Sequence, residues 1–172
     1  IATHAANFPD CEHVVADINN YDMRRLPKTQ ILFGSPICKE GSPAGGNATI
    51  RIQGPLAGAD GHAGAASWER TRATAYDLLR AAEVHRYDVI AGENVVDFAT
   101  RWTMFPWFIK AWDILDYVPQ VASVNAAHLT DDGNEAARQV RHRILFVMTR
   151  KGITPPDLRV RPACVCHECG PV

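Results

Sequence analysis

Short apolar runs alternate with amphipathic stretches along the chain, which predicts strands alternating with helices. Residues 30–34, 88–92 and 144–148 are apolar runs next to turn-forming or polar residues, and each is expected to be a buried strand. Residues 120–126 are a further candidate strand. This alternation favours an α/β fold, an open and mostly parallel sheet with helices on both faces.

Two stretches have the spacing of amphipathic helices. The first follows Ser67, whose hydroxyl can cap a helix, and the second contains Pro106, which is tolerated in a first turn. Their apolar faces consist of Trp68, Ala75, Leu79 and Ala82 in the first helix, and of Phe105, Phe108, Ile109, Trp112 and Leu115 in the second.

Two segments lack such periodicity. Residues 39–66 are rich in Gly, Ala and Pro and predict a long loop, and loops of this length in compact domains are commonly functional. The pattern also breaks up after Pro155 and Pro156, where the chain becomes basic. We therefore divide the sequence into a main domain, residues 1–153, and a following segment, residues 154–172.

Composition narrows the class of protein. The chain has 172 residues, of which 47% are hydrophobic and 22% charged, which is typical of one soluble globular domain. No apolar run is long enough for a membrane span, and no secretory signal is visible. The formal net charge is −1, yet several basic residues crowd the C-terminal part, where they could bind phosphates. They are Arg138, Arg141, Arg143, Arg150, Lys151, Arg159 and Arg161.

The five cysteines do not form an even disulfide framework. An odd count, with three of them close together near the end, fits a reducing compartment such as the cytoplasm. The chain begins at Ile1 rather than Met and stops just after the cysteine cluster. We therefore expect it to be a piece of a longer protein.

Cys38 is the first candidate for chemistry, because it lies in a turn-forming stretch just after the first predicted strand. The adjacent Lys39 would favour the thiolate, which is the nucleophilic form of cysteine. The alternative is a small buried thiol without a chemical role.

Two further sites lie at strand ends. Glu93 follows the apolar run 88–92, where partial burial would raise the pKa of its carboxyl and let it donate a proton or hydrogen bond. Gln139, Arg141 and Arg143 alternate in an extended segment, so their side chains share one face that suits a phosphate or a base edge. The alternatives are a carboxylate in an ordinary salt bridge and a solvated basic strand.

These pieces together resemble the DNA (cytosine-5) methyltransferases. The resemblance rests on Ser35-Pro36-Ile37-Cys38, on Glu93-Asn94-Val95, and on Gln139-x-Arg141-x-Arg143 before an apolar strand, in this order. It extends to Asn7-Phe8-Pro9, Asp17-Ile18 and Asn125-Ala126, and so covers the chain from about Thr3 to about Arg150. The order and spacing of the motifs are specific, although each motif alone is weak.

The resemblance implies a truncated Rossmann-like methyltransferase fold that uses S-adenosylmethionine. In that family a thiolate, here Cys38, adds to C6 of a cytosine that has been flipped out of duplex DNA, and C5 then takes the methyl group. Glu93 would contact N3 and the exocyclic amino group of the base. Arg141 and Arg143 would hold the base and the DNA backbone.

The remaining roles implied by the resemblance concern binding. Asp17, Ile18, Ser35 and Pro36 correspond to positions that contact the cofactor. Ser42, Asn94 and Gln139 correspond to positions that contact or support the substrate, and the glycines of the loop after Cys38 fit a lid that moves.

The sequence also departs from the family pattern. The family has proline immediately before the nucleophile, where this chain has Ile37, and proline before the glutamine, where this chain has Arg138. The glycine-rich cofactor motif would precede Ile1, and the target-recognition region would follow Val172. We therefore expect residues 1–153 to be a partial catalytic domain and this chain alone to have weak or no activity.

The cysteine cluster near the end is a separate signal. Cys166-x-x-Cys169-Gly170 has the spacing of half a zinc knuckle, and Cys164 or His167 could be an extra ligand. Such a site would brace the start of a target-recognition region in residues 154–172. The alternative is a set of free exposed thiols.

Two other functions stay open at the level of sequence. The chain could belong to a catalytically inactive DNA-binding relative, or to an enzyme that methylates cytosine in RNA by the same chemistry. If the protein methylates DNA, restriction-modification or phage self-protection in a bacterial cytoplasm would be its context.

Overall fold

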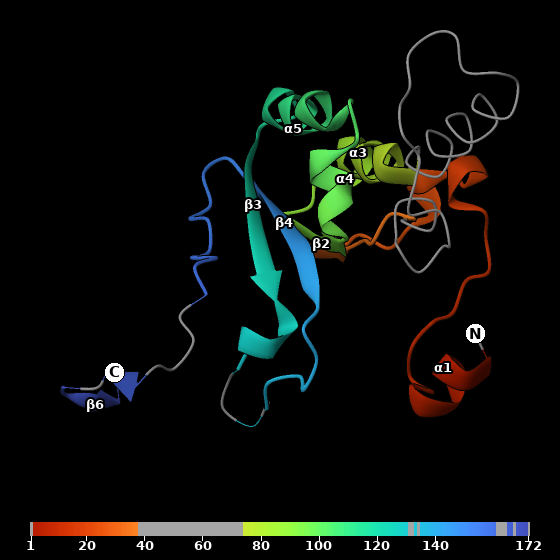
Figure 1. Ribbon diagram of the computed structural model, residues 1–172. Coiled ribbons are helices and arrows are strands. Elements are labelled where there is room, and N and C mark those ends of the chain that lie inside the picture. The colour runs from red at the N-terminus through yellow and green to blue at the C-terminus, as the bar shows by residue number, and fades with distance from the viewer. Residues whose placement is uncertain are drawn as a thin grey trace, which may run out of the picture.

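The computed structural model describes residues 2–37, 74–130, 133, 135–160, 165–166 and 168–171. A mixed four-stranded sheet forms the centre of the fold (Figure 1). In spatial order its strands are β1 (Ile31–Phe33), β2 (Val89–Asn94), β4 (His142–Arg150) and β3 (Tyr117–Asn125). β1 and β2 pair in parallel, whereas β4 is antiparallel to both of its neighbours. Three strands therefore point the same way, and the predicted α/β fold is confirmed.

Helices connect the strands and cover the sheet (Figure 1). The helical segments are α1 (Ala2–Asn7), η1 (Ile18–Asn20), η2 (Met23–Arg25), α3 (Thr74–His85), α4 (Val96–Thr100), α5 (Phe105–Ile114) and η5 (Ala126–His128). A short hairpin of β5 (Val165–Cys166) and β6 (Gly170–Pro171) lies near the C-terminal end. None of the helices in the described part of the chain has the length and apolar character that a bilayer-spanning helix needs.

The hydrophobic core lies between α3, α4, α5 and one face of the sheet. Ile90, Phe146 and Met148 alternate with outward residues along β2 and β4, and their side chains share that face. Phe98 of α4 and Trp112 of α5 pack there and are almost fully buried. Within the described residues these three helices all pack on this one face, whereas the sequence predicted helices on both faces.

The predictions from sequence agree with the structure for most strands and helices but differ at some boundaries. The predicted strands and the helix at 105–115 are present, and β3 begins at Tyr117, three residues before the predicted start at 120. The predicted start of the other helix, at Ser67, lies outside the described residues. The burial pattern of α3 places Leu78 deeper than Leu79, and α4 was not predicted because five residues are too few to show a helical period.

An arginine attaches the N-terminal segment to α3. Arg80 donates hydrogen bonds to the backbone oxygens of Asn19 and Tyr21 at 3.1 and 3.0 Å, and it pairs with the buried Asp77 at 2.6 Å. Its guanidinium has several donors in one plane, so a single side chain can satisfy the carbonyls of a turn and a carboxylate at once. The segment that carries Asp17 and Ile18 therefore sits against α3.

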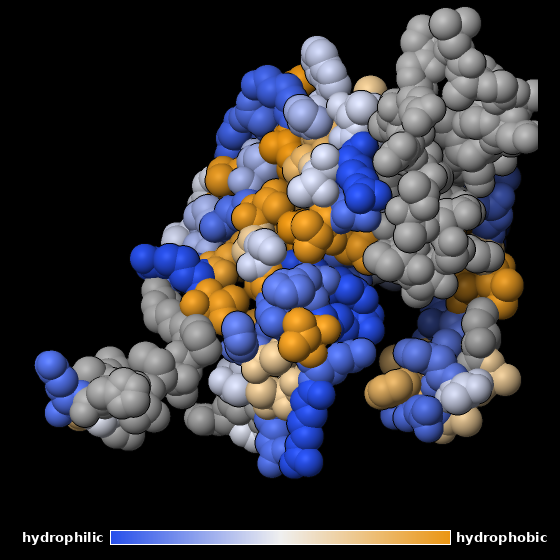
Figure 2. Space-filling view, viewed as in Figure 1, coloured by the Kyte–Doolittle hydropathy of each residue, from blue (hydrophilic) through white to orange (hydrophobic). Residues whose placement is uncertain are grey.

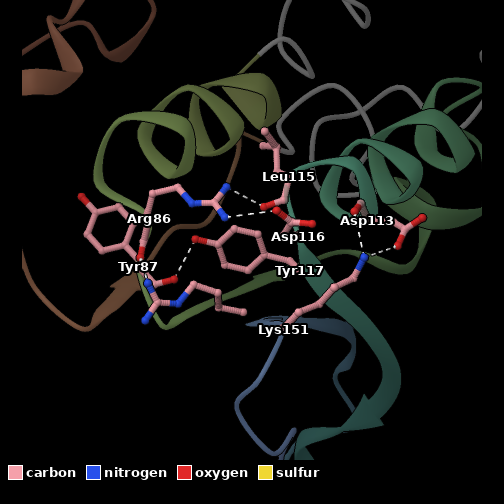
Figure 3. Close-up of polar contacts among 8 residues, drawn as sticks. Arg86, Tyr87, Asp113, Leu115, Asp116, Tyr117 and Lys151 are labelled. Carbon is pink, nitrogen blue, oxygen red and sulfur yellow. Dashed lines mark hydrogen bonds and ion pairs between the residues drawn. The ribbon is translucent and has the colours of Figure 1, made fainter.

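A polar network closes the edge of the sheet where β2 and β3 begin (Figure 3). Arg86, directly after α3, and Asp116, shortly after α5, have the left-handed φ values of 53° and 66°. Arg86 donates a hydrogen bond to the Leu115 oxygen at 2.7 Å and contacts the Asp116 carboxylate at 3.5 Å. These contacts join the turn after α3 to the turn after α5, where both residues have a conformation that is unfavourable for L-amino acids. Nearby, hydrogen bonds from Lys110 and Lys151 lower the pKa of the Asp113 carboxyl.

The buried phenol of Tyr117 completes this network. Its hydroxyl donates to the Tyr87 backbone oxygen at 2.7 Å, and both tyrosine rings are almost fully buried (Figure 3). Burial raises the pKa of Tyr117 and that of Tyr87, because the charged phenolate loses its hydration.

We expect stability to fall at alkaline pH through these two phenols. An unfolded tyrosine loses its proton near pH 10, whereas the folded phenols keep theirs to higher pH, so folding is favoured below about pH 10 and progressively less above it. Tyr117→Phe should weaken this fall, and should also cost about 1 kcal/mol at neutral pH through the lost hydrogen bond. Urea denaturation at pH 8 and pH 11 measures both effects, and an unchanged pH dependence in the variant would contradict the assignment.

Candidate active site

The predicted site residues that the structure describes gather mainly at one edge of the sheet, opposite the network of Figure 3. β1, β2 and β3 end at this edge and β4 begins there, because Asn94 pairs with Ile144 and Asn125 pairs with His142. We call it the carboxyl edge. It consists of Gly34, Ser35, Pro36 and Ile37 after β1, of Glu93 and Asn94 in β2, of Asn125 in β3, and of Arg141, His142 and Arg143 at the start of β4.

Gly92 allows β1 and β2 to end close together. Gly34 N donates to the Ala91 oxygen at 2.9 Å, which extends the parallel pairing one residue beyond β1. A Cβ on Gly92 would lie 2.1 Å from the Gly34 oxygen and 2.2 Å from the Phe146 ring. Position 92 therefore accepts only glycine without a backbone shift.

Glu93 and Arg143 form an ion pair across the sheet. Glu93 lies opposite Leu145, two residues from Arg143, so both side chains point to the face that does not carry the helices. Arg143 Nε contacts Glu93 Oε1, and the two side chains are 23% and 40% exposed respectively. The carboxylate is thus held in place by the guanidinium but remains open to a ligand.

Asn94 points the other way, into the core. It is 1% exposed, its amide nitrogen donates to the Pro36 oxygen at 3.0 Å, and its amide oxygen accepts from Val95 N at 2.8 Å. Both ends of the amide are therefore used within the protein. Asn94 was predicted to contact the substrate, but in this position it orders the segment after β1.

Asn125 holds the start of β4 in a similar way. Its side-chain oxygen accepts from Ala127 N at 3.1 Å and from Arg141 N at 3.0 Å. Arg141 is exposed, and Gln139 is exposed in a bend before the strand. The three residues of the predicted extended segment therefore differ: Arg143 lies in β4, Arg141 just precedes it, and Gln139 is outside the sheet.

The surface around this segment is mixed, because Val140 between the arginines is 74% exposed. Figure 2 shows hydrophobic residues across the middle of the viewed face, and both hydrophilic and hydrophobic residues around the end of β3 and the start of β4. Arg138 and Arg141 are exposed cations there. Such a surface can accept an anionic partner.

Several predicted site residues lie outside the described residues. Cys38, which follows directly on Ile37 in the sequence, is not among them, and neither are Ser42, Cys164 and His167. The role of Cys38 as nucleophile therefore stays a prediction, and the described chain ends one residue before it, at Ile37.

Of the predicted metal ligands, only Cys166 and Cys169 are among the described residues. Cys169 is an exposed free thiol in the β5–β6 hairpin, where Cys166 pairs with Gly170 through the backbone. Gly170 has a φ of +84°, which suits the glycine that follows the second cysteine of a knuckle. Among the described residues no group of three or more histidines, cysteines and carboxylates could hold a metal ion.

The residues predicted to bind a cofactor lie in two places. The exposed Asp17 caps η1, and its carboxylate accepts from Asn19 N at 3.1 Å and from Asn20 Nδ2 at 2.8 Å. Ile18 is 39% exposed and Ser35 is exposed, so a ligand can reach both. Pro36 is buried, and its carbonyl oxygen accepts a hydrogen bond from Asn94.

Comparison with known proteins gives matches in structure but not in sequence. No family model matches the chain, and no curated protein matches it either. A mutant of DNMT2 from Spodoptera frugiperda has a TM-score of 0.55 at 16% identity, and the match covers 92% of this chain and 41% of that one. An Escherichia coli protein, named as a DNA modification methyltransferase encoded within a prophage, has a TM-score of 0.57 at 18% identity, with 94% and 42% covered.

The chain shares its fold with a part of these two structures. It spans about two fifths of the length of the two solved structures, so it corresponds to a part of that fold. In this shared α/β fold, β1, β2 and β3 end at the carboxyl edge, and such edges collect the reactive groups of α/β proteins.

Sequence reasoning missed two residues that support the carboxyl edge. Gly92 was treated only as the end of an apolar run, and Thr74 was not singled out. Thr74 Oγ1 accepts from Ile37 N at 2.9 Å, which a threonine at the start of a helix can do for a distant segment. No local signal identifies that partner, because the two residues are far apart in the sequence.

Substituting Gly92 tests how closely β1 and β2 must approach. Gly92→Ala should lower the free energy of unfolding by about 1–3 kcal/mol, because the new methyl group meets a backbone oxygen and a buried ring. The change is measured as a shift in the urea midpoint. Ala91→Ser, one residue away on the opposite face, is the matched control and should shift the midpoint much less. Equal shifts would contradict this reading of the contact.

Proposed function

We propose that this chain is the catalytic part of a DNA cytosine-5 methyltransferase. It would transfer a methyl group from S-adenosylmethionine to C5 of a cytosine that has been flipped out of duplex DNA, through a covalent adduct between Cys38 and C6. The observation that carries this proposal is the carboxyl edge, where the segment leading to Cys38, the carboxylate of Glu93 and the guanidinium of Arg143 come from three adjacent strands.

The proposed chemistry needs these residue types because C5 of cytosine is a poor nucleophile. The Cys38 thiolate adds to C6, and the electron pair displaced toward C5 makes that carbon nucleophilic. S-adenosylmethionine, when bound, supplies the methyl group that C5 takes. A base then removes the C5 proton, and the bond between C6 and sulfur breaks to release the thiolate.

Glu93 and Arg143 act on the same ring in this proposal. Glu93 contacts N3 and the exocyclic amino group, and Arg143, already paired with that carboxylate, fixes its orientation and reaches the ring oxygen. Arg141 holds the DNA backbone near the nucleophile, supported by Asn125. The half-exposed position of Glu93 is compatible with a base entering from the face that carries no helix.

Part of the cofactor's contact set fits this proposal. Asp17, Ile18 and Ser35 are exposed and could contact it, with Ile18 offering an apolar surface for an adenine ring. Pro36 does not fit as a contact, because its ring is buried and its carbonyl is already bonded.

Trapping the covalent adduct tests the central residue. The complete protein that carries this chain, incubated with S-adenosylmethionine and duplex DNA containing 5-fluorocytosine, should form a stable protein–DNA adduct, because fluorine at C5 blocks the final elimination. Cys38→Ala should abolish the adduct, which is detected as a shifted band in a denaturing gel. Cys11→Ala, at an exposed cysteine elsewhere in the chain, is the control and should retain it.

The outcomes of this assay separate the candidate functions. An adduct with the Cys38→Ala variant would contradict the assignment of Cys38 as the nucleophile. An adduct with single-stranded RNA but not with duplex DNA would favour an RNA cytosine methyltransferase. DNA binding without any adduct or cofactor binding would favour an inactive DNA-binding relative.

A second variant tests the carboxylate. Glu93→Gln keeps the shape of the side chain but removes its charge and its ability to exchange a proton, so the single-turnover rate of methylation should fall about 10²-fold or more. Quench-flow measurement of methyl transfer gives this rate. Asp97→Asn, a change at another carboxylate four residues along the chain, is the control, and an equal loss in both variants would contradict a specific role for Glu93.

A further inference from the structure

A short turn near the N-terminus has a defined shape but little hydrophobic attachment to the fold. It consists of η1 and its cap, residues 17–20, and we call it the N-terminal turn. Asn20 N donates to the Asp17 backbone oxygen at 3.1 Å, and the Asp17 carboxylate accepts from Asn19 N and from Asn20 Nδ2. No side chain of η1 is buried. These internal bonds fix the shape of the turn but not its place on the protein.

Arg80 of α3 connects this turn to the rest of the fold. Its Nη1 donates to the Asn19 oxygen at 3.1 Å and to the Ile18 oxygen at 3.4 Å, and its Nη2 donates to the Tyr21 oxygen at 3.0 Å. Two nitrogens of one planar guanidinium therefore bind carbonyls before and after Asn20. Because these carbonyls belong to the turn and to the residue after it, Arg80 sets where the turn lies against α3.

The guanidinium is itself held from α3 by Asp77. Asp77 Oδ1 accepts from Arg80 Nη1 at 2.6 Å, and the two residues lie three apart on the same helix. The side chain of Asp77 is 6% exposed and that of Arg80 is 44% exposed, so the carboxylate is the buried partner. The helix thus carries both the side chain that contacts the turn and the carboxylate that orients it.

The next turn, η2, is attached in a different way. Met23 is 3% exposed and belongs to the core, and its backbone oxygen is 2.7 Å from His85 Nε2. The imidazole nitrogen is the donor of this bond, because a carbonyl oxygen can only accept. A buried side chain therefore anchors η2 independently of Arg80. The two turns should respond to different substitutions on the same helix.

The N-terminal turn presents an apolar side chain and a carboxylate to a ligand. Ile18 is 39% exposed, and Asp17 is exposed. Such a turn adds most to affinity when its place is fixed before the ligand arrives, because otherwise part of the binding free energy is lost in ordering it.

We propose that Arg80 is a positioning residue for ligand binding. It fixes the place of the N-terminal turn on α3, so that Ile18 and Asp17 form a preorganised wall of the site for S-adenosylmethionine. The identity of this ligand rests on the proposed function. The placement of the turn is a property of Arg80 and its carbonyl partners, and it can be measured in the protein without a ligand.

The test compares two variants in one background. Removing Arg80 alone would leave the buried Asp77 carboxylate without its cation and would destabilise the whole protein. Asp77→Asn avoids this, because the amide oxygen can still accept from Arg80 but carries no charge. The comparison is therefore between Asp77→Asn and the double variant Asp77→Asn/Arg80→Met, which differ in the guanidinium and its bonds to the turn.

Hydrogen exchange without ligand measures how firmly the turn is held. Amides in peptides that cover residues 17–21 should exchange about 10-fold faster in the double variant than in Asp77→Asn, because a turn without its charge-assisted hydrogen bonds opens more readily. Peptides from η2 and β2 should exchange equally in both variants. Equal exchange of the turn, or faster exchange in all regions alike, would overturn the proposal.

Calorimetric titration of the complete protein with S-adenosylmethionine measures the consequence for the ligand. The Kd of the double variant should be about 10-fold higher than that of Asp77→Asn, while the single-turnover rate of methyl transfer at saturating cofactor should stay within about twofold. His85→Phe, which keeps a ring beside Tyr87 but loses the bond to Met23, is the control and should leave the Kd unchanged. A lower rate at an unchanged Kd, or an equal effect of His85→Phe, would contradict the proposal.

Arg80→Lys keeps the test decisive if the double variant does not fold. Lysine retains the charge beside Asp77, but its single nitrogen cannot reproduce the planar fork that binds the Asn19 and Tyr21 carbonyls. Exchange of the turn and the Kd for S-adenosylmethionine should therefore rise together, by about threefold or more. An increase in neither would contradict the proposal.

The outcomes also separate this proposal from the proposed function. Weaker binding of S-adenosylmethionine by the double variant, in a protein that forms no adduct with 5-fluorocytosine DNA, would contradict DNA methylation and still support the role of Arg80. Faster exchange of the turn with an unchanged Kd would overturn the assignment of the turn to the ligand site, even if the adduct forms. A complete protein that binds no S-adenosylmethionine would contradict both.

Discussion

The arrangement of the carboxyl edge depends on the hydrogen bonds of the buried Asn94 side chain. This side chain bonds the Pro36 oxygen on one side and Val95 N on the other, and so ties the segment after β1 to the end of β2. The two strand ends can approach because a Cβ at Gly92 would collide with the Gly34 oxygen, whereas glycine leaves that space free. A single polar side chain in the core thus fixes the backbone two residues before Cys38.

Two neighbouring residues of β2 have different roles: Asn94 is structural, and Glu93 is the candidate for chemistry. Successive side chains of a strand point to opposite faces, so Asn94 enters the core while Glu93 reaches the face without helices. There Glu93 meets Arg143 through a diagonal pairing that the β2–β4 register dictates. Because this ion pair is partly exposed, it orients the carboxylate more than it stabilises the fold. The dipeptide Glu93-Asn94 therefore places the candidate catalytic carboxylate directly beside a residue that is anchored in the core.

Much of the fold could be predicted from the sequence because its strands are strongly apolar and bounded by turns, as at 88–92 and 144–148. The carboxyl edge also followed from strand order, which placed Glu93 and the segment before Cys38 together. The rest depends on tertiary contacts that no local pattern carries. The burial of Asn94 and the bond between Thr74 and Ile37 join distant segments, and α4 is too short to show a period. The Glu93–Arg143 pair needs the register of β4, which spacing along the chain does not fix.

The most direct measurement of the central claim is a crystal structure of the complete protein bound to duplex DNA that contains 5-fluorocytosine. The account predicts continuous density from the Cys38 sulfur to C6 of a flipped base, with Glu93 on the N3 side of the ring and Arg143 beside the ring oxygen. A base that remains stacked in the duplex, or one that binds away from the end of β2, would contradict it.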